Sequence, residues 1–291
     1  MLVTSIMGRR VVAKSNWKAF PHPDKAFDYA GDKLAKAWPK LHAGDQEPYP
    51  DEKHVAKLLK ANPKLGKDAG KIAAALQDAW RAFHRGDFHA AYEGGLALKA
   101  LGASVAIKAG GIHATYLVDS ETEKSARFDG LACYADEAIK ALPDEANSHY
   151  RRAFALGRYS QTISITAALA QGVAGKVKES LDKALKLAPK HAEARIALGM
   201  YNAEIVGKVG GMLAKLTYGA SGAEAEKQLK EALKLTPDSP IAHAEFGNAL
   251  LLLHGSDRED DVAAAYAKAA KIKPLDAMEA LDGAWAKEQI E

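Results

Sequence analysis

The sequence predicts an all-α fold, a right-handed solenoid of helical hairpins, from a repeated pattern and from composition. Four stretches of similar sequence, YADEAIKALP, SLDKALKLAP, QLKEALKLTP and AYAKAAKIKP, each end in a proline (Pro143, Pro189, Pro237 and Pro274). Each stretch also has an alanine five residues before its proline (Ala138, Ala184, Ala232 and Ala269). A small residue where two helices touch, an apolar stripe and a proline that ends the second helix are the features of a helix-turn-helix repeat. Hydrophobic residues make up 48% of the chain, and many of them are alanine, the best helix former.

Composition and charge limit the function classes. The 291 residues can form one elongated domain or two compact ones. The net charge of +3 is too small to indicate a nucleic-acid partner, and the aromatic share of 7% argues against a large aromatic ligand pocket. Residues 1–70 carry 13 Lys and Arg against 8 Asp and Glu, a net charge of +5. This segment favours an acidic partner or a membrane surface, or else it is a solvated lysine-rich helical face.

The single cysteine and the start of the chain bear on the compartment. Cys133 has no second cysteine for an intrachain disulfide, and its apolar neighbours predict a buried structural thiol. No apolar run reaches 18 residues, so no transmembrane helix is expected. The start, MLVTSIMGRRVVAKSNW, lacks an adequate apolar region with a cleavage site, and the pair Arg9-Arg10 lacks the long apolar segment of an export signal. We therefore expect a cytoplasmic protein.

The first 70 residues are predicted to form a basic helical extension to the solenoid. Asp24 can cap a helix that runs to about Trp38. The turn-rich segment 42–52, HAGDQEPYPDE, is predicted to be a loop. A short helix follows and should end near Asn62, because the residue before a proline disfavours helical geometry.

Residues 71–291 are predicted to form the helical-repeat domain. Its first hairpin should turn at Arg85-Gly86-Asp87, where an aromatic residue and a small one begin the next helix. The following break falls around residues 119–124, and Ser120 or Thr122 can cap the helix after it.

Two later elements complete the predicted order. A long helix is expected from about Glu145 to Ala170, before a turn marked by Gly172 and Gly175. The tail, 275–291, is predicted to be a capping helix. Three of its apolar residues would cover the otherwise exposed face of the last hairpin (Met278, Leu281 and Trp285).

One repeat is longer than the others. The unit between Pro189 and Pro237 spans 48 residues, against 37 for the next unit and roughly 34 for a standard repeat. The surplus lies in a glycine-rich insertion at about 206–222. We expect a helical insertion with a local core of its own (Met212, Leu213, Leu216 and Tyr218). The alternative is a mobile lid or docking surface, because each glycine in a helix interior costs roughly 1 kcal/mol of helix stability.

The units from about residue 145 onward resemble tetratricopeptide repeats. Three glycines stand where that repeat has a glycine in its first helix (Gly157, Gly199 and Gly247). The repeated alanines fall on its late alanine, and Tyr266 on its aromatic position. The usual Trp and Tyr of the first helix are mostly replaced, as by Arg195 and His243.

The same region is also similar to the regulator of microtubule dynamics family. The resemblance rests on the order HYRRAFALGRYSQ, KVKESLDKALKLAPKHAEARIALGMYNAEI, a lengthened glycine-containing segment and EAEKQLKEALKLTPDSP. It implies a tetratricopeptide-like domain with an insertion at the same place, and a role named for the cytoskeleton.

The sequence contains no recognised catalytic or metal-binding motif. The ten histidines have no companions at metal-ligand spacing, and His84 and His89 are interpreted as capping or surface residues. The segments VGKVGG and KAGGIHAT lack the spacing of a phosphate-binding loop. We therefore expect a protein that is not an enzyme and has no metal or other cofactor.

The first predicted function is binding of a protein or peptide partner on the concave face, with the oligomeric state left open. In a helical array the inner surface is formed by the first helix of each pair. The residues predicted to line it are Tyr150, Arg151, Arg158, Gln161, Met200, Glu204, Glu245 and Asn248. Arginine can hold a peptide carboxylate through two parallel hydrogen bonds, and asparagine can pair with a peptide backbone. If so, Arg151→Glu with Arg158→Glu should lose partner capture at an unchanged melting temperature.

The second predicted function is binding of a small molecule or lipid. Its pocket would lie beside the insertion at 206–222, near Tyr159, Tyr201 and Tyr218. Such a protein should carry its ligand through purification, where native mass spectrometry would detect it.

Overall fold

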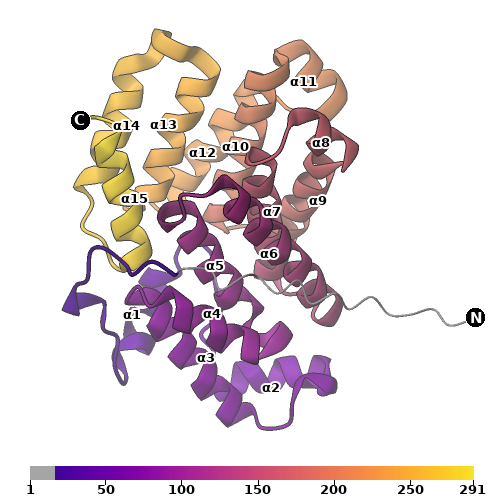
Figure 1. Ribbon diagram of the computed structural model, residues 1–291, viewed down its shortest axis with the longest axis vertical. Coiled ribbons are helices and arrows are strands. Elements are labelled where there is room, and N and C mark those ends of the chain that lie inside the picture. The colour runs from indigo at the N-terminus through magenta and orange to yellow at the C-terminus, as the bar shows by residue number, and fades with distance from the viewer. Residues whose placement is uncertain (1–16) are drawn as a thin grey trace, which may run out of the picture.

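The computed structural model describes residues 17–291, which form helices with no β-strand among them. The chain start and the pair Arg9-Arg10 lie outside the described residues. The α-helices are α1 (Lys33–Leu41), α2 (Glu52–Ala61), α3 (Ala69–His84), α4 (Phe88–Ala97), α5 (Ala103–Leu117), α6 (Glu121–Ala141), α7 (Ala146–Gln161), α8 (Ile165–Ala170), α9 (Val173–Leu187), α10 (Ala192–Val209), α11 (Gly211–Tyr218), α12 (Gly222–Leu235), α13 (Pro240–His254), α14 (Glu259–Lys271) and α15 (Ala277–Glu288). Short 3-10 helices are η1 (Lys25–Phe27), η2 (Pro63–Leu65), η3 (Lys99–Gly102) and η4 (Gly255–Arg258). Successive helices pack on one another as hairpins (Figure 1), so the predicted all-α solenoid class is confirmed.

The N-terminal segment does not form the predicted helix up to Trp38. Asp24 caps only η1, where its side chain accepts a hydrogen bond from the amide of Ala26. Gly31 then takes the left-handed conformation, with a φ of 58°, before α1 begins. A left-handed residue ends helical hydrogen bonding, so the chain turns where a continuous helix was predicted. The loop after α1 and the end of α2 before Asn62 are confirmed.

Side-chain caps set the starts of several later helices. Asp87 caps α4 after the predicted turn, and Ser120 caps α6. The helix predicted from Glu145 to Ala170 is instead two helices, α7 and α8. The hydroxyl of Ser164 accepts a hydrogen bond from the amide of Ala167 at 3.1 Å and so starts α8. A serine that bonds to nearby backbone competes with helix continuation.

The repeated small residues mostly lie where helices cross. The alanines that precede the four prolines are all 0% exposed (Ala138, Ala184, Ala232 and Ala269). A Cβ on Gly199 would lie 2.6 Å from Leu229 Cγ, and one on Gly247 would lie 2.8 Å from Tyr266 Cε1, so these two crossings need glycine. Gly157 differs, because a Cβ there would meet no heavy atom within 4 Å. This glycine is therefore not required by a helix crossing.

Two predictions about burial are wrong. Cys133 is exposed, because it lies off the buried stripe of α6 (Phe128, Leu131, Ala132, Ala135 and Ala138). His84 is neither a cap nor a surface residue: it is 1% exposed, and its Nδ1 lies 2.8 Å from Asp276 Oδ2. His89 is on the surface, as predicted, with a side chain that is 56% exposed.

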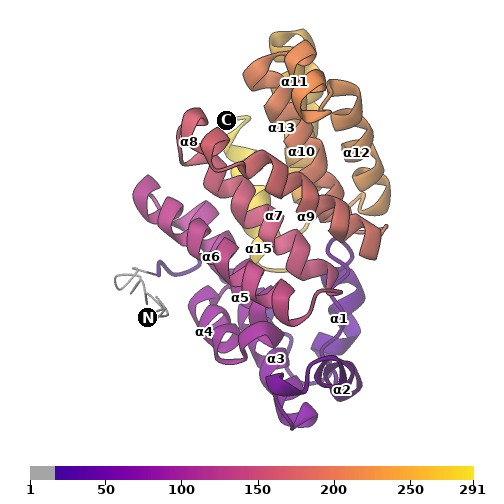
Figure 2. The ribbon, with the colours of Figure 1, turned by 90° about the vertical axis from the view of Figure 1, so that its right-hand side faces the viewer.

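The C-terminal helix closes the array onto its beginning. α15 packs against α13 and α14, as a capping helix should, and it also contacts α3 (Figure 1, Figure 2). Met278 and Leu281 share one hydrophobic core with Trp38, Trp80 and Phe83. This core contains residues from both sides of the predicted boundary near residue 70, and the division into 1–70 and 71–291 stays a prediction. The closure brings α15 onto the concave side of the array.

Candidate functional site

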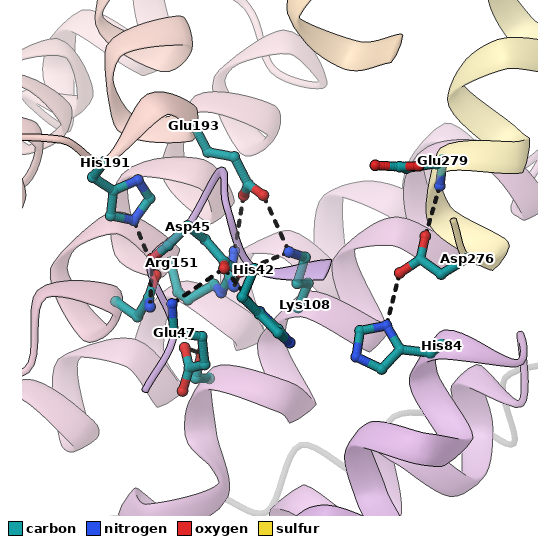
Figure 3. A network of polar contacts seen from close by, with 12 residues as sticks. His42, Asp45, Glu47, His84, Lys108, Arg151, His191, Glu193, Asp276 and Glu279 are labelled. Atoms are coloured by element: carbon teal, nitrogen blue, oxygen red, sulfur yellow. Dashed lines mark hydrogen bonds and ion pairs between the residues drawn. The ribbon is translucent and has the colours of Figure 1, made fainter. Parts of the chain in front are cut away.

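A buried ion network occupies part of the concave side (Figure 3). The loop between α1 and α2 enters there and carries Asp45, whose side chain is 0% exposed. One carboxylate oxygen of Asp45 accepts hydrogen bonds from Lys108 Nζ and Arg151 Nη2, both at 2.7 Å. The other carboxylate oxygen lies 2.8 Å from Nδ1 of His42. Side chains from α5, α7 and the loop itself therefore hold one buried carboxylate.

Glu193, near the start of α10, completes the network. Its carboxylate pairs with the same two cations, at 3.1 and 3.4 Å. Its backbone amide donates to the carbonyl oxygen of Gly44 at 3.0 Å, and Asn147 Nδ2 donates to the carbonyl oxygen of Asp45 at 2.9 Å. The loop is thus held through its backbone as well as its side chain, as a bound peptide would be. It occupies part of the surface on which a partner peptide was predicted.

Mutual attraction keeps the network charged despite its burial. Burial alone raises the pKa of Asp45, but Lys108, His42 and Arg151 hold it well below its ordinary value. Burial likewise disfavours the two cations, yet Asp45 and Glu193 raise the pKa of Lys108 and of Arg151 above their ordinary values. Asp45, Lys108 and Arg151 therefore stay charged at neutral pH, and removal of one of them leaves an unpaired charge in the interior.

Three buried histidines are expected to stay neutral in mildly acidic solution. Burial lowers the pKa of His42, His113 and His191 to about 4, against about 6.5 for an exposed histidine. The unfolded chain would bind these protons between pH 6.5 and 4 while the folded chain would not, so these groups destabilise the fold as the pH falls through that window. In an NMR pH series we expect their Cε1 protons to titrate near pH 4, and near 6.5 in urea. A midpoint near 6.5 in the native protein would show that the histidine is solvated.

Sequence reasoning named Arg151 but missed its partners Asp45 and Lys108. Asp45 stands in a turn-rich segment, and Lys108 lies 63 residues away in a stretch considered only as a weak phosphate motif. No local spacing connects them, so only the fold brings them together. Arg151 is 2% exposed, and Arg151→Glu would add a third carboxylate to the network. That variant therefore changes stability together with binding and does not test the groove by itself.

Beside the network lies a cavity of about 390 Å³. All the residues predicted on the concave face line it except Asn248 (Tyr150, Arg151, Arg158, Gln161, Met200, Glu204 and Glu245). Arg158 of α7 reaches across to α13, where its Nη2 lies 3.1 Å from Glu245 Oε1. Asn248 lies behind this wall and donates to Glu245 Oε2 at 2.8 Å. The fold thus brings these residues together around one cavity, and their part in binding stays a prediction.

The pocket predicted beside the insertion is the same cavity. Tyr201 of α10 and Tyr218 of α11 line it, whereas Tyr159 does not. Apolar residues of α8, α9 and α10 form much of the remaining wall (Ile165, Leu169, Val173, Ile205 and Val209). The two binding sites predicted from the sequence therefore converge on one place in the fold.

The insertion does not form the predicted core of its own. Its large apolar side chains are 81%, 52% and 79% exposed (Met212, Leu213 and Leu216, in that order). The buried residue of α11 is Ala214, and Tyr218 turns to the cavity. Ala214 is the buried residue of this eight-residue helix, so Met212, Leu213 and Leu216 lie in solvent.

The insertion and α8 together border the cavity and form what we call the rim, residues 159–178 and 205–223. On α8, Ile165 is 57% exposed and Leu169 is 56% exposed, and both residues also line the cavity. The two rim segments contain four lysines and no acidic residue (Lys176, Lys178, Lys208 and Lys215). Two of these lysines pair with carboxylates just outside the segments, Lys178 with Asp182 and Lys208 with Glu204, so the mouth of the cavity is apolar and only weakly basic.

Two kinds of feature are absent from the part of the chain that the structure describes. No helix between residues 17 and 291 combines the length and the hydropathy needed to cross a bilayer. Over the same residues, His, Cys, Asp and Glu side chains form no group of three or more that could hold a metal ion.

Comparison with known proteins gives a family similarity over part of the chain. No curated protein matches it. The family model described as Regulator of microtubule dynamics protein 1-3 matches residues 112–239. This range runs from within α5 to the turn after α12, and it includes the insertion and most of the cavity wall. Over this segment, the chain is similar to the regulators of microtubule dynamics, as its sequence predicted.

Proposed function

We propose that the protein is a non-catalytic binding protein that holds a small amphipathic molecule in the cavity. The observation that carries this proposal is the closure of the concave side by α15 and by the loop that bears Asp45, which leaves a volume of about 390 Å³. Cavities of roughly 300–1,000 Å³ are the usual size of small-molecule sites. Two turns of a helical peptide, about 10 Å across and 11 Å long, fill roughly 850 Å³. A small molecule is therefore the better match in size to this cavity.

The cavity wall has a polar part and an apolar part. Its charged side chains include one from each of α5, α7, α13 and α15 (Lys108, Arg158, Glu245 and Asp282). α8, α9 and α10 contribute a second group of lining residues that is mainly aliphatic, although α10 also contributes Glu193, Glu204 and Lys208. A hydrocarbon chain is stabilised against the second group, and a compact polar group can find hydrogen-bond partners in the first. This arrangement supports an amphipathic ligand over a wholly polar or wholly apolar one.

A cavity-filling variant tests the proposal. Gly157 lines the cavity, and a Cβ there meets nothing within 4 Å, so the side chain of Gly157→Leu can leave the backbone freely and should occupy part of the cavity. It also replaces a glycine in a helix interior, which favours folding by up to about 1 kcal/mol. We expect native mass spectrometry to show a ligand carried by the wild type and absent from Gly157→Leu, with a melting temperature at least as high.

Gly130→Leu is the matched control. Gly130 lies in α6 and is exposed, and a Cβ there would likewise meet nothing within 4 Å, but this residue does not line the cavity. We expect this variant to keep the ligand. Equal ligand content in wild type and both variants, or none in any of them after lipid and metabolite loading, would count against a cavity ligand.

The rim favours a second candidate, the protein-partner function predicted from the sequence. Exposed apolar side chains on segments that also carry lysines suit a partner with an apolar and acidic surface. The similarity to a family named as regulators supports an adaptor-like role of this kind. A partner docked on the rim would be retained by Gly157→Leu and lost when Met212 and Leu216 are changed to Ser, which separates the two candidates.

A further inference from the structure

One carboxyl oxygen in the cavity wall has no hydrogen-bond partner among the described residues. Asp282 of α15 lines the cavity and is 1% exposed. Its Oδ1 accepts a hydrogen bond from the hydroxyl of Tyr116 at 2.5 Å. Its Oδ2 is buried and has no hydrogen-bond partner within residues 17–291. An unsatisfied buried acceptor costs on the order of 1–3 kcal/mol, so a ligand that donates to it recovers that free energy.

Asp282 differs from the other charged residues of the cavity wall, which form ion pairs. Each cation of the wall already has a carboxylate partner, with Lys108 and Arg151 on Asp45, Arg158 on Glu245 and Lys208 on Glu204. Asp282 forms no ion pair with a residue of the described chain. Counted together with Asp45, which lies behind the wall, the lining residues therefore have one carboxyl group more than they have cations to pair with it.

The groups that face Asp282 are mostly acidic. Burial, and then the nearby carboxylates of Asp276, Glu193 and Glu245, raise the pKa of Asp282 to about 7, despite the hydrogen bond from Tyr116. Two of the helices packed on α15 contribute a titratable residue that already has a partner. His84 of α3 bonds to Asp276, and Glu245 of α13 forms an ion pair with Arg158. A positive group placed beside Asp282 would lower this electrostatic cost.

We infer that the cavity takes an amphipathic amine, whose ammonium group donates to Asp282 Oδ2 while its hydrocarbon chain lies against the aliphatic wall of α8, α9 and α10. This inference rests on the proposed function, since it names the ligand class of the same cavity. A charge-assisted hydrogen bond is roughly twice as strong as a neutral one, so an ammonium group is favoured over a hydroxyl. A carboxylate group would meet Asp282 and its acidic neighbours and is disfavoured.

Three probes of equal chain length test the inference: dodecylamine, dodecanol and dodecanoate, titrated below their micelle concentrations. We expect dodecylamine to bind about tenfold or more tightly than dodecanol to the wild type, and dodecanoate to bind most weakly. Asp282→Asn keeps the shape and the acceptor for Tyr116 but removes the charge. In this variant we expect the affinity for dodecylamine to fall to that for dodecanol, with the dodecanol affinity unchanged.

Glu204→Gln is the control, because Glu204 lines the same cavity but already pairs with Lys208 at 3.2 Å. It should leave the preference for the amine in place. The wild type gives an independent check if Asp282→Asn does not fold: its affinity for dodecylamine should rise between pH 5.5 and 8, as Asp282 loses its proton, while dodecanol affinity stays constant. The ammonium group itself remains protonated up to about pH 10.

The outcomes separate this inference from the proposed function. If dodecanol and dodecanoate bind as tightly as dodecylamine, and Asp282→Asn changes nothing, the amine is wrong and the cavity remains a ligand site. If none of the three probes binds, or if Gly157→Leu binds them as the wild type does, the cavity itself is not the site and both proposals fall.

Discussion

Asp45→Ala is expected to lower the free energy of unfolding by about 3–5 kcal/mol, because it leaves the two buried cations Lys108 and Arg151 with the single carboxylate of Glu193 and so leaves one positive charge uncompensated. The loss should appear as a lower midpoint in guanidinium unfolding, followed by tryptophan fluorescence. Trp38, one of four tryptophans, stacks on His42 with ring centroids 4.0 Å apart, so part of this emission comes from a side chain beside the loop. Asp28→Ala, in the same N-terminal segment but exposed, is the control and should stay within about 0.5 kcal/mol of the wild type.

A second variant separates the loss of the Asp45 charge from the loss of its side-chain volume. Asp45→Asn keeps most of the volume and one hydrogen-bond acceptor while it removes the charge. If the charge balance stabilises the fold, Asp45→Asn should be nearly as destabilising as Asp45→Ala. A loss below about 1 kcal/mol in both variants would show that water reaches Lys108 and Arg151, which contradicts the buried network described above.

Leu281→Ala is expected to cost about 2–5 kcal/mol, the range for a large-to-small change in a packed core. Leu281 is 5% exposed and lies in the core that α15 shares with the N-terminal helices. Its loss should therefore increase hydrogen exchange in α3 as well as in α15, although these helices are far apart in the sequence. Ile290→Ala, at a residue 45% exposed just beyond α15, is the control and should have little effect on either helix.

The pattern of exchange distinguishes a closed array from an open one. If α15 only capped the last hairpin, Leu281→Ala would loosen α13 to α15 and leave α3 unchanged. Unfolding would then separate into two transitions, because the ends of a repeat array can unfold independently when they do not touch. A single transition at lower denaturant, with faster exchange in α3, is the result expected from the structure.

Local patterns in the sequence were sufficient to predict the repeating hairpins. The alanines before the prolines are fully buried, and Gly199 and Gly247 lie at helix crossings. The turn before Asp87 and the cap at Ser120 are also where the sequence placed them. These features depend on neighbours three to five residues away or on the next helix, which is the range over which helical periodicity carries information.

The sequence was less informative where a side chain bonds to nearby backbone, or where a contact between distant residues determines the local structure. The hydrogen bond that the Ser164 hydroxyl accepts from the amide of Ala167 begins a new helix where the hydrophobic periodicity predicted one continuous helix. The apolar residues of the insertion stay exposed, because Ala214 is the residue by which α11 is buried and periodicity does not say which face has a partner. Gly157 resembles the other repeat glycines in sequence but borders a cavity instead of a helix.

The sequence by itself determined the all-α class, the hairpin order and the residues that form the inner helices, because helix propensity, capping and periodicity act locally. The tertiary structure decided that the array closes, that the loop with Asp45 fills part of its concave side, and that a cavity of about 390 Å³ remains. Closure of the array depends on contacts such as that of Tyr116 with Asp282, which are 166 residues apart in the sequence. The position of the loop depends on contacts such as that of Asp45 with Arg151, which are 106 residues apart. Whether such pairs meet depends on the summed rotations between successive hairpins, a quantity that no local pattern of residues specifies.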